Sequence, residues 1–535
     1  MTPTLLRPLA ALVVPVLFLE ACEKKRDPPA EPTAENTEQR RPVDAEVALA
    51  GRVLFMGDSI THAGHYVSMI DAVLRETTPE SFPDLINLGL PSEGVTGLSE
   101  PDHPFPRPNA HERLERALET VKPDLVFACY GMNDGIYYPF SEERFAAYRS
   151  GIDRLVEVVH AAGAKLVLVT PPPFDPEPLR AAGKLKPAGA DTYAWFEIYE
   201  NYDTETLAPY SAWLLDQRDR VEGVIDAREP VLAYVAEKRR ADPAFTLSND
   251  GVHLNEEGHR VLAGAILDAL GIGAGKLAAL DADRLEKVHA AQMLLHAAWM
   301  SHVGHTRPQV RPGLPLPVAR AVAALPESET PKFLFNQIDL KGWDGDSRYW
   351  SVEPGERGAP AAIVGRNEGE VPSSTYLFTE AEPRDFRLFF EVRQTVSPAH
   401  STMHSAVAAL GQRIDDEGGN TRGFRGPLLM FCHDWGIWDA HRRNRVEPVG
   451  QKGAFRVDAE KVGDWNLCEI LVIGDRLRFA VNGASVFDFT DQPDLLRKSP
   501  LGLQLHKNAK PQEYRFRGLV LTESPEDRLV SVPSR

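Results

Sequence analysis

From residue 51 onward, short apolar runs alternate with longer amphipathic stretches, and this alternation is the first guide to the fold. The amphipathic stretches have helical spacing, as in Ser141–Ala162, where apolar side chains recur on one face. Strands that alternate with helices pair in parallel through right-handed crossovers, so residues 51–305 are expected to form a three-layer α/β/α domain. The expected strands are Val53–Met56, Leu85–Leu88, Leu125–Cys129, Lys165–Thr170 and Val224–Asp226.

A long helical stretch and a proline-rich segment follow the last of these strands. Lys276–Met300 has helical spacing and is expected to close the first domain. Residues 306–332 carry repeated prolines and are expected to form a mainly extended linker, which could include a short helix around Ala319–Leu325.

After Phe333 the pattern changes to strands without helices between them. Turn signals separate these strands, and Asn482-Gly483 is a strong hairpin signal. Residues 333–522 are therefore predicted to form an all-β sandwich of the jelly-roll kind, with a tail at 523–535. The clearest strands are Phe386–Val392, Glu469–Ile473, Arg476–Val481 and Tyr514–Leu521.

The first residues of the chain have the features of an export signal. The apolar run Leu9–Leu19 is too short to cross roughly 30 Å of hydrocarbon, so residues 1–22 are interpreted as a signal peptide. Leu19 and Ala21 before Cys22 resemble the lipobox of bacterial lipoproteins, in which the cysteine is lipidated. The alternative is ordinary signal-peptide cleavage. Residues 23–50 are expected to be a disordered tether, and the protein to be a cell-envelope lipoprotein, periplasmic or at the cell surface, or a secreted protein.

Composition excludes some classes of function. A net charge of -18 argues against a nucleic-acid partner, because phosphate contacts are made largely by Lys and Arg. The four cysteines match neither a disulfide framework nor a zinc site. No cofactor and no metal ion is implied, although His400 and His404 have the i, i+4 spacing of helical metal ligands.

Chemically useful residues gather at the expected strand ends. Gly57-Asp58-Ser59 follows the first strand, Asn87-Leu88-Gly89 lies at the end of the second, Asn133 follows the third, and Asp250 to His253 follows the fifth. Parallel strands bring such segments to one edge of the sheet. A serine hydroxyl needs a base, for which His253 is the candidate, and Asp250 could hold the imidazole tautomer.

These groups, in this order, resemble blocks I, II, III and V of the SGNH or GDSL hydrolases over residues 51–272. The resemblance implies a flavodoxin-like fold and ester hydrolysis with Ser59, Asp250 and His253 as the catalytic triad. It also implies an oxyanion hole formed by the amides of Ser59 and block II and by the side chain of Asn133. Many members of the family have glycine at the place of Ser92, so Gly89 and Ser92 are both candidates for the block II amide.

The second domain resembles the β-sandwich family of 3-keto-disaccharide hydrolases, which is related in fold to laminin-G and concanavalin-type lectins. The matching pieces include Trp350, Gly463-Asp464-Trp465-Asn466 and Gly502-Leu503-Gln504-Leu505-His506. The family's Gly-aromatic-Glu stretch is absent from the central strands, so no catalytic residues are transferred. A cluster suited to stacking on a sugar and hydrogen-bonding its hydroxyls comprises Asp434, Trp435, Trp438, Arg442 and Arg443.

The sequence therefore predicts a serine esterase that removes acetyl or other short acyl groups from a carbohydrate, with a β-sandwich that binds or processes the glycan. The expected partners are an acylated carbohydrate or another ester and, through the lipid anchor, a membrane. Alternatives are a lipase or lysophospholipase with the same triad, a glycan-binding surface protein with an inert hydrolase domain, or a glycoside-processing β domain.

Overall fold

The computed structural model describes residues 51–77, 82–396, 405–415, 422–430, 437–438, 457–491 and 498–533. The predicted signal peptide, Cys22 and the tether lie outside these ranges and stay predictions, as do His400 and His404. Among the helices that are described, none combines the length and apolarity needed to cross a bilayer.

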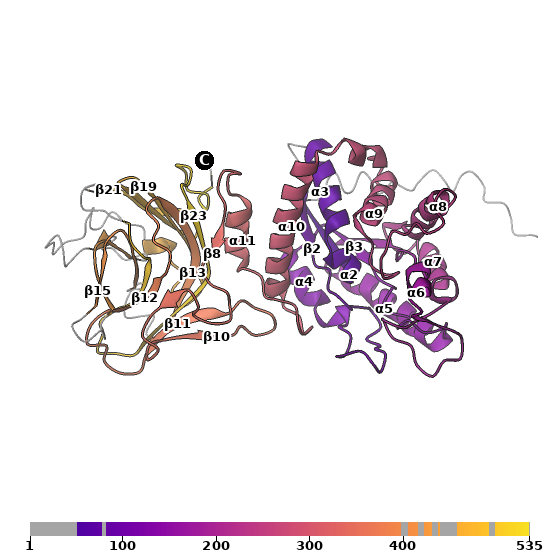
Figure 1. Cartoon of the computed structure of the whole chain (residues 1–535), viewed down its shortest axis with the longest axis horizontal. Helices are drawn as coiled ribbons and strands as arrows, with labels where there is room; N and C mark the ends of the chain where they lie inside the picture. Colours follow the sequence, from indigo (N-terminus) through magenta and orange to yellow (C-terminus); the bar gives the residue numbers. More distant parts are fainter. Residues whose placement is uncertain are drawn as a thin grey trace, which may run out of the picture. The chain divides into compact units, whose positions relative to one another are not determined.

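The first domain is built on a parallel sheet with the strand order β2-β1-β3-β4-β7 (Figure 1). All neighbouring strands in this sheet run parallel. Counted along the chain this order is 2-1-3-4-5, the doubly wound order of flavodoxin-like folds. The α/β prediction is confirmed. The strands are β1 (Arg52–Gly57), β2 (Asp84–Asn87), β3 (Leu125–Cys129), β4 (Lys165–Val169) and β7 (Gly223–Ile225).

Helices cover both faces of this sheet because its strands are apolar on both sides. Leu54 and Met56 point into one apolar cluster, with α4 and α5, while Val53 and Phe55 point into the other, with α3 and α9. The main helices of this domain are α2 (Ser59–His62), α3 (His65–Thr77), α4 (Leu114–Val121), α5 (Glu142–Ala161), α6 (Glu177–Ala181), α7 (Ala208–Leu215), α8 (Arg228–Lys238), α9 (Glu256–Ala269) and α10 (Ala282–Val303). A small parallel pair, β5 (Leu185–Lys186) and β6 (Ile198–Tyr199), lies in the segment after β4.

The closing helix and the proline-rich segment differ from the sequence prediction in detail. Helix α10 starts at Ala282 because Asp281 caps it by accepting from the Arg284 amide at 2.9 Å, after a separate 3₁₀ turn. Helix α11 (Leu316–Ala323) starts three residues before the expected short helix. Its prolines lie at the N-terminus, where their missing N–H groups cost little.

The second domain is an antiparallel sandwich, which confirms the all-β prediction (Figure 1). Its core lies between two sheets and contains fully buried side chains from both, such as Phe390 and Leu503. One sheet comprises β10 (Trp350–Glu353), β11 (Ala362–Asn367), β23 (Gln512–Glu523), β13 (Phe386–Val396), β19 (Asn466–Ile473), β20 (Arg476–Val481) and β21 (Ala484–Thr490), with β8 (Lys332–Phe333) paired to β23. The other comprises β18 (Ile437–Trp438), β17 (Leu428–Met430), β14 (Ala406–Ala408), β22 (Gly502–Leu505), β12 (Thr375–Thr379) and β9 (Trp343–Asp344). A separate pair is formed by β15 (Gln412–Asp415) and β16 (Arg422–Arg425).

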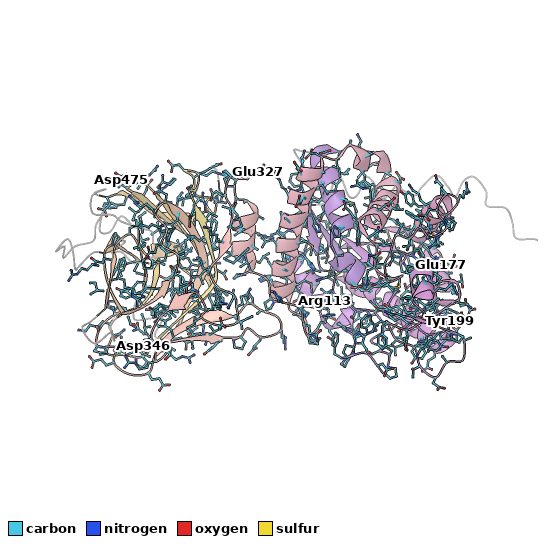
Figure 2. The ribbon with its side chains drawn as sticks, viewed as in Figure 1. Arg113, Glu177, Tyr199, Glu327, Asp346 and Asp475 are labelled. Atoms are coloured by element: carbon cyan, nitrogen blue, oxygen red, sulfur yellow. The ribbon has the colours of Figure 1, made fainter. Side chains whose placement is uncertain are left out.

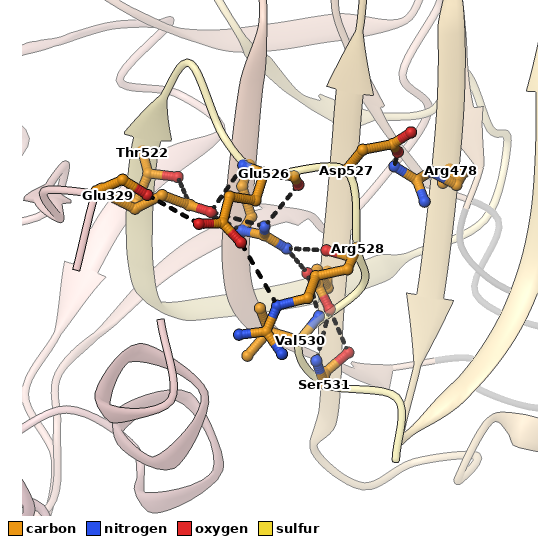
Figure 3. A network of polar contacts seen from close by, with 11 residues as sticks. Glu329, Arg478, Thr522, Glu526, Asp527, Arg528, Val530 and Ser531 are labelled. Carbon is orange, nitrogen blue, oxygen red and sulfur yellow. Dashed lines mark hydrogen bonds and ion pairs between the residues drawn. The ribbon is translucent and has the colours of Figure 1, made fainter. Parts of the chain in front are cut away.

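A buried ionic network fixes both ends of this domain to its larger sheet (Figure 3). The Arg387 guanidinium, on β13, pairs with Glu329 at 2.9 Å and with Glu469, and all three side chains are 0% exposed. Residues beyond β23 contact the same groups: the Glu526 amide donates to Glu329 at 3.0 Å and the Val530 amide donates to Glu469 at 2.9 Å. The predicted tail is therefore held against the sheet as far as residue 531.

Candidate active site

Ser59 lies at the carboxyl end of β1, where the strand passes directly into a helix. Asp58 caps α2 by accepting from the Ile60 amide at 2.9 Å, and Ser59 is the first helical residue. The first amides of a helix have no intrahelical partner. The turn thus places the Ser59 hydroxyl and amide together at the edge where ligands bind in parallel sheets.

Asp250 and His253 lie on a tight turn in the segment between α8 and α9. The amides of Val252 and His253 both donate to Asp250 Oδ1, at 3.0 and 2.8 Å. Gly251 makes this turn possible because its φ of 78° is in the left-handed region, which glycine adopts without steric cost. The turn therefore fixes the carboxylate next to the imidazole.

The three predicted triad side chains form a continuous chain of hydrogen bonds. His253 Nδ1 donates to Asp250 Oδ2 at 2.7 Å, and the Ser59 hydroxyl donates to His253 Nε2 at 2.8 Å. The carboxylate accepts only, so it selects the tautomer that leaves Nε2 free to accept a proton. The side chains of His253 and Asp250 are 50% and 52% exposed, so the site is open to solvent.

The electrostatics of this chain favour a charged Asp250 beside a readily protonated His253. The hydrogen bond to Asp250 raises the pKa of His253 above its usual value, and the carboxylate's charge adds to the effect. Burial alone would raise the pKa of Asp250, but hydrogen bonds from the His253 ring and amide hold it below its usual range. Nearby, burial raises the pKa of Asp58 to about 7.

The block II loop, which begins at Asn87, packs closely on the backbone of α2, and Gly89 permits this approach. A Cβ on Gly89 would lie 2.3 Å from the His62 backbone nitrogen. The Gly89 amide donates to Asn87 Oδ1 at 2.8 Å, while Asn87 Nδ2 donates to the Thr61 carbonyl at 2.7 Å. The Gly89 amide is therefore engaged in packing the loop onto α2, and its role as an oxyanion donor stays a prediction.

Ser92 is the other block II candidate, and its backbone has the conformation that glycine favours. Its φ is 67°, which explains why glycine is common at this place in the family that the sequence resembles. The Ser92 carbonyl accepts from Arg107 Nη1 at 3.4 Å. The backbone N–H at this position is present with either serine or glycine, so Ser92 keeps the donor that the oxyanion hole needs.

Asn133 lies in the loop after β3 and is 4% exposed. Its Nδ2 donates to the Glu93 carbonyl at 3.0 Å. Its Oδ1 accepts from Arg107 Nη1 at 2.8 Å and from the Tyr137 hydroxyl at 2.9 Å. The amide is thus fixed on both sides, with one of the two Nδ2 hydrogens not used in these bonds.

Buried ionic side chains contact the block II loop and fix its position. Arg113, labelled in Figure 2, donates to both carboxylate oxygens of Glu93 at 2.7 and 2.6 Å and to the Leu88 carbonyl at 2.6 Å. Asp134 Oδ1 accepts from the amides of Val95 and Thr96 at 2.8 and 3.0 Å, and burial raises its pKa to about 6. Asp134, which directly follows Asn133 in block III, therefore connects block III to the segment that follows block II.

The predicted glycan-binding cluster lies almost entirely outside the part of the chain that the structure describes. Trp438 ends β18, but its side chain lies outside what the structure describes, as do Asp434, Trp435, Arg442 and Arg443. The glycan-binding cluster stays a prediction. Where side chains are described, no three His, Cys, Asp or Glu are grouped as a metal ion would require.

Sequence reasoning missed Arg107 and Tyr137, which both contact Asn133. Arg107 lies in a segment with prolines at 101, 104, 106 and 108, and belongs to no motif. Tyr137 follows Asn133 closely in the chain, and that proximity was a usable signal. An isolated arginine among prolines gives no such sign.

Two family models match the chain, one for each domain. Residues 55–261 match the GDSL-like lipase/acylhydrolase family, and residues 330–522 match the 3-keto-alpha-glucoside-1,2-lyase-like domain. No curated protein matches the chain significantly.

Solved structures resemble parts of the chain. One is a gut microbial diltiazem-metabolizing enzyme, with 21% identity over 41% of this chain and 47% of that chain and a TM-score of 0.31. The match thus spans about half of that enzyme. Another is a carbohydrate acetylesterase family member from Sinorhizobium meliloti, with 20% identity over 41% of this chain and 99% of that chain and a TM-score of 0.29.

Residues 55–261 form a GDSL-like lipase/acylhydrolase domain, a hydrolase of ester bonds, and a 3-keto-alpha-glucoside-1,2-lyase-like domain follows it at residues 330–522.

Proposed function

We propose that the first domain removes acetyl or similarly short acyl groups from a carbohydrate through an acyl-enzyme on Ser59. The observation that carries the proposal is the chain of hydrogen bonds from Asp250 through His253 to Ser59. The carbohydrate part rests on the second domain, whose family model describes a glucoside-processing domain. The open site suits an ester carried on a large polymer.

Acylation begins when His253 Nε2 takes the Ser59 proton as Oγ attacks the ester carbonyl carbon. The negative charge that develops on the carbonyl oxygen is stabilised by the amides of Ser59 and Ser92 and by Asn133 Nδ2. Asp250 stabilises the imidazolium that forms. The intermediate then collapses, the bond to the sugar oxygen breaks, and that oxygen receives the proton from His253.

Deacylation repeats these steps with water as the nucleophile. His253 Nε2 removes a proton from water as the water oxygen attacks the acyl carbon, and the same donors hold the oxyanion. The bond to Ser59 Oγ then breaks, the proton returns to Ser59, and the short carboxylic acid leaves.

The rate is expected to depend on pH through the imidazole of His253. A general base must be neutral, and the pKa of His253 is raised, so kcat/KM is expected to fall as pH decreases through a value above 6.5. Rates with p-nitrophenyl acetate between pH 4 and 9 measure this. A rate that stays constant down to pH 4 would contradict His253 as the base.

The substrate class is tested by comparing esters on a polymer with free esters. Acetate release from acetylated xylan and turnover of p-nitrophenyl acetate and p-nitrophenyl laurate are measured for the full chain, with Ser59→Ala as the blank. The proposal expects acetate release and acetyl turnover at least tenfold faster than laurate turnover, because a short-acyl site excludes about ten methylenes of apolar chain.

The other outcomes separate the alternatives. Faster laurate turnover would favour a lipase. No turnover of any ester, together with binding of the glycan, would favour a glycan-binding protein with an inert hydrolase domain. Release of a sugar that persists in Ser59→Ala would assign the chemistry to the β domain.

A further inference from the structure

The amide of Asn133 is held in a single orientation by two donors on its oxygen. Arg107 Nη1 and the Tyr137 hydroxyl both donate to Oδ1, at 2.8 and 2.9 Å. If the amide were flipped, its NH₂ group would face the N–H groups of Arg107, and no hydrogen bond could form there. Since one Nδ2 hydrogen goes to the Glu93 carbonyl, the other is the one available to a substrate oxygen.

Arg107 reaches Asn133 from a buried ion pair. Its Nε and Nη2 atoms donate to the two carboxylate oxygens of Glu100 at 2.7 and 2.6 Å, and the side chains are 3% and 0% exposed. Burial would lower the pKa of Arg107, but the hydrogen bonds and charge of Glu100 raise it, so the guanidinium stays charged. The same Nη1 atom contacts the Ser92 carbonyl, so one side chain connects the block II and block III candidates.

Tyr137 reaches Asn133 through a strained turn. Ile136 and Tyr137 have φ values of 48° and 64°, in the left-handed region, and this conformation is rare for a β-branched residue such as isoleucine. A strained backbone conformation of this kind persists only where surrounding contacts enforce it, and it is found often at functional sites. Here the Tyr137 carbonyl accepts from the Tyr199 amide at 3.1 Å, and its ring lies 5.3 Å from that of Tyr202.

We propose that Arg107 and Tyr137 are positioning residues that hold Asn133 so that its free N–H points to the oxyanion. This inference rests on the proposed acyl transfer at Ser59. Donors on Oδ1 withdraw electron density from the amide, and its N–H therefore becomes a stronger donor in a connected network. The benefit arises only when the oxyanion forms, so it is expected in kcat and not in KM.

The test is a double-mutant cycle between Tyr137 and Asn133, with p-nitrophenyl acetate as substrate and the full chain as enzyme. Tyr137→Phe removes one hydroxyl and keeps the ring. It is expected to lower kcat about tenfold and to leave KM within about twofold, a smaller loss than the 10²–10³ seen when an oxyanion donor itself is removed. In the Asn133→Ala background the same change is expected to lower kcat by less than about twofold.

Arg107→Lys provides a second measurement because lysine keeps the charge but not the fork that contacts Glu100 and Asn133 together. A comparable loss of kcat is expected. The matched control is Tyr148→Phe, which also removes a buried tyrosine hydroxyl. That hydroxyl donates to the backbone carbonyl of Tyr130 at 3.0 Å and not to Asn133. Its kcat is expected to stay at the wild-type value, and thermal melting confirms that each variant is folded.

The outcomes separate this inference from the function on which it rests. Wild-type kcat in Tyr137→Phe, or equal losses with and without Asn133, would overturn the positioning role while the acyl transfer stands. A wild-type chain without esterase activity, or full activity in Ser59→Ala, would overturn the acyl transfer itself.

Discussion

Replacing Ser59 by alanine is expected to lower kcat for p-nitrophenyl acetate by about 10⁴- to 10⁶-fold, the range that removal of a triad nucleophile produces. The variant loses the oxygen that attacks the ester, and the residual rate comes from direct attack by water on an ester whose carbonyl oxygen is bound by the oxyanion hole. Alanine keeps the start of α2 because Asp58 supplies the cap. Steady-state rates of the purified full chain measure the effect.

Two further variants make this result specific. Ser211→Ala is the control, because it removes a serine hydroxyl that lies away from the triad and only donates to the Leu207 carbonyl at 2.9 Å. Its kcat is expected to stay within about twofold of the wild-type value. A combined Ser59→Ala and His253→Ala variant is expected to be no slower than Ser59→Ala alone, because the two residues act as a unit. Esterase activity above about 1% of wild type in Ser59→Ala would exclude a Ser59 acyl-enzyme.

The largest effect on stability is expected from Arg387→Met in the β domain. Methionine fills a similar space but leaves the carboxylates of Glu329 and Glu469 buried without their cation. Breaking a buried pair from one side costs about 3–5 kcal/mol, which corresponds to a decrease of roughly 10 °C in the melting temperature of a domain of this size. Differential scanning calorimetry of the full chain measures the shift.

Arg476→Met is the control for that change. Arg476 also lies on the larger sheet, but its pair with Asp488 is exposed, with the two side chains 41% and 46% accessible. Exposed pairs contribute about 0–1 kcal/mol, so a shift of at most about 4 °C is expected. Equal shifts in the two variants would show that the buried network does not stabilise the domain.

The sequence predicted best those elements whose ends are marked by local chemistry. Strands β3 and β20 have the predicted bounds, and β20 ends directly before the predicted turn Asn482-Gly483. Strand β12 was missed because it is short and buried on both sides, so it has no alternation of polar and apolar residues.

The candidate site was predictable where residues are close in the chain and less so where they meet only in space. Asp250 and His253 share one turn, and their contact follows from their spacing. The sequence left Gly89 and Ser92 open as candidates, and spacing alone could not show that the Gly89 amide donates to the Asn87 side chain. The contact of Arg107 with Asn133 joins segments 26 residues apart, and only the fold reveals it.

The network around Arg387 also indicates where the second domain ends as a folding unit. The family match stops at residue 522, yet the amides of Glu526, Val530 and Ser531 provide hydrogen bonds to the two buried carboxylates. A chain shortened to the family boundary would expose those carboxylates to water and lose these three backbone hydrogen bonds. The buried charges therefore set the boundary of the smallest chain expected to fold as this domain, about ten residues beyond the end of the family match.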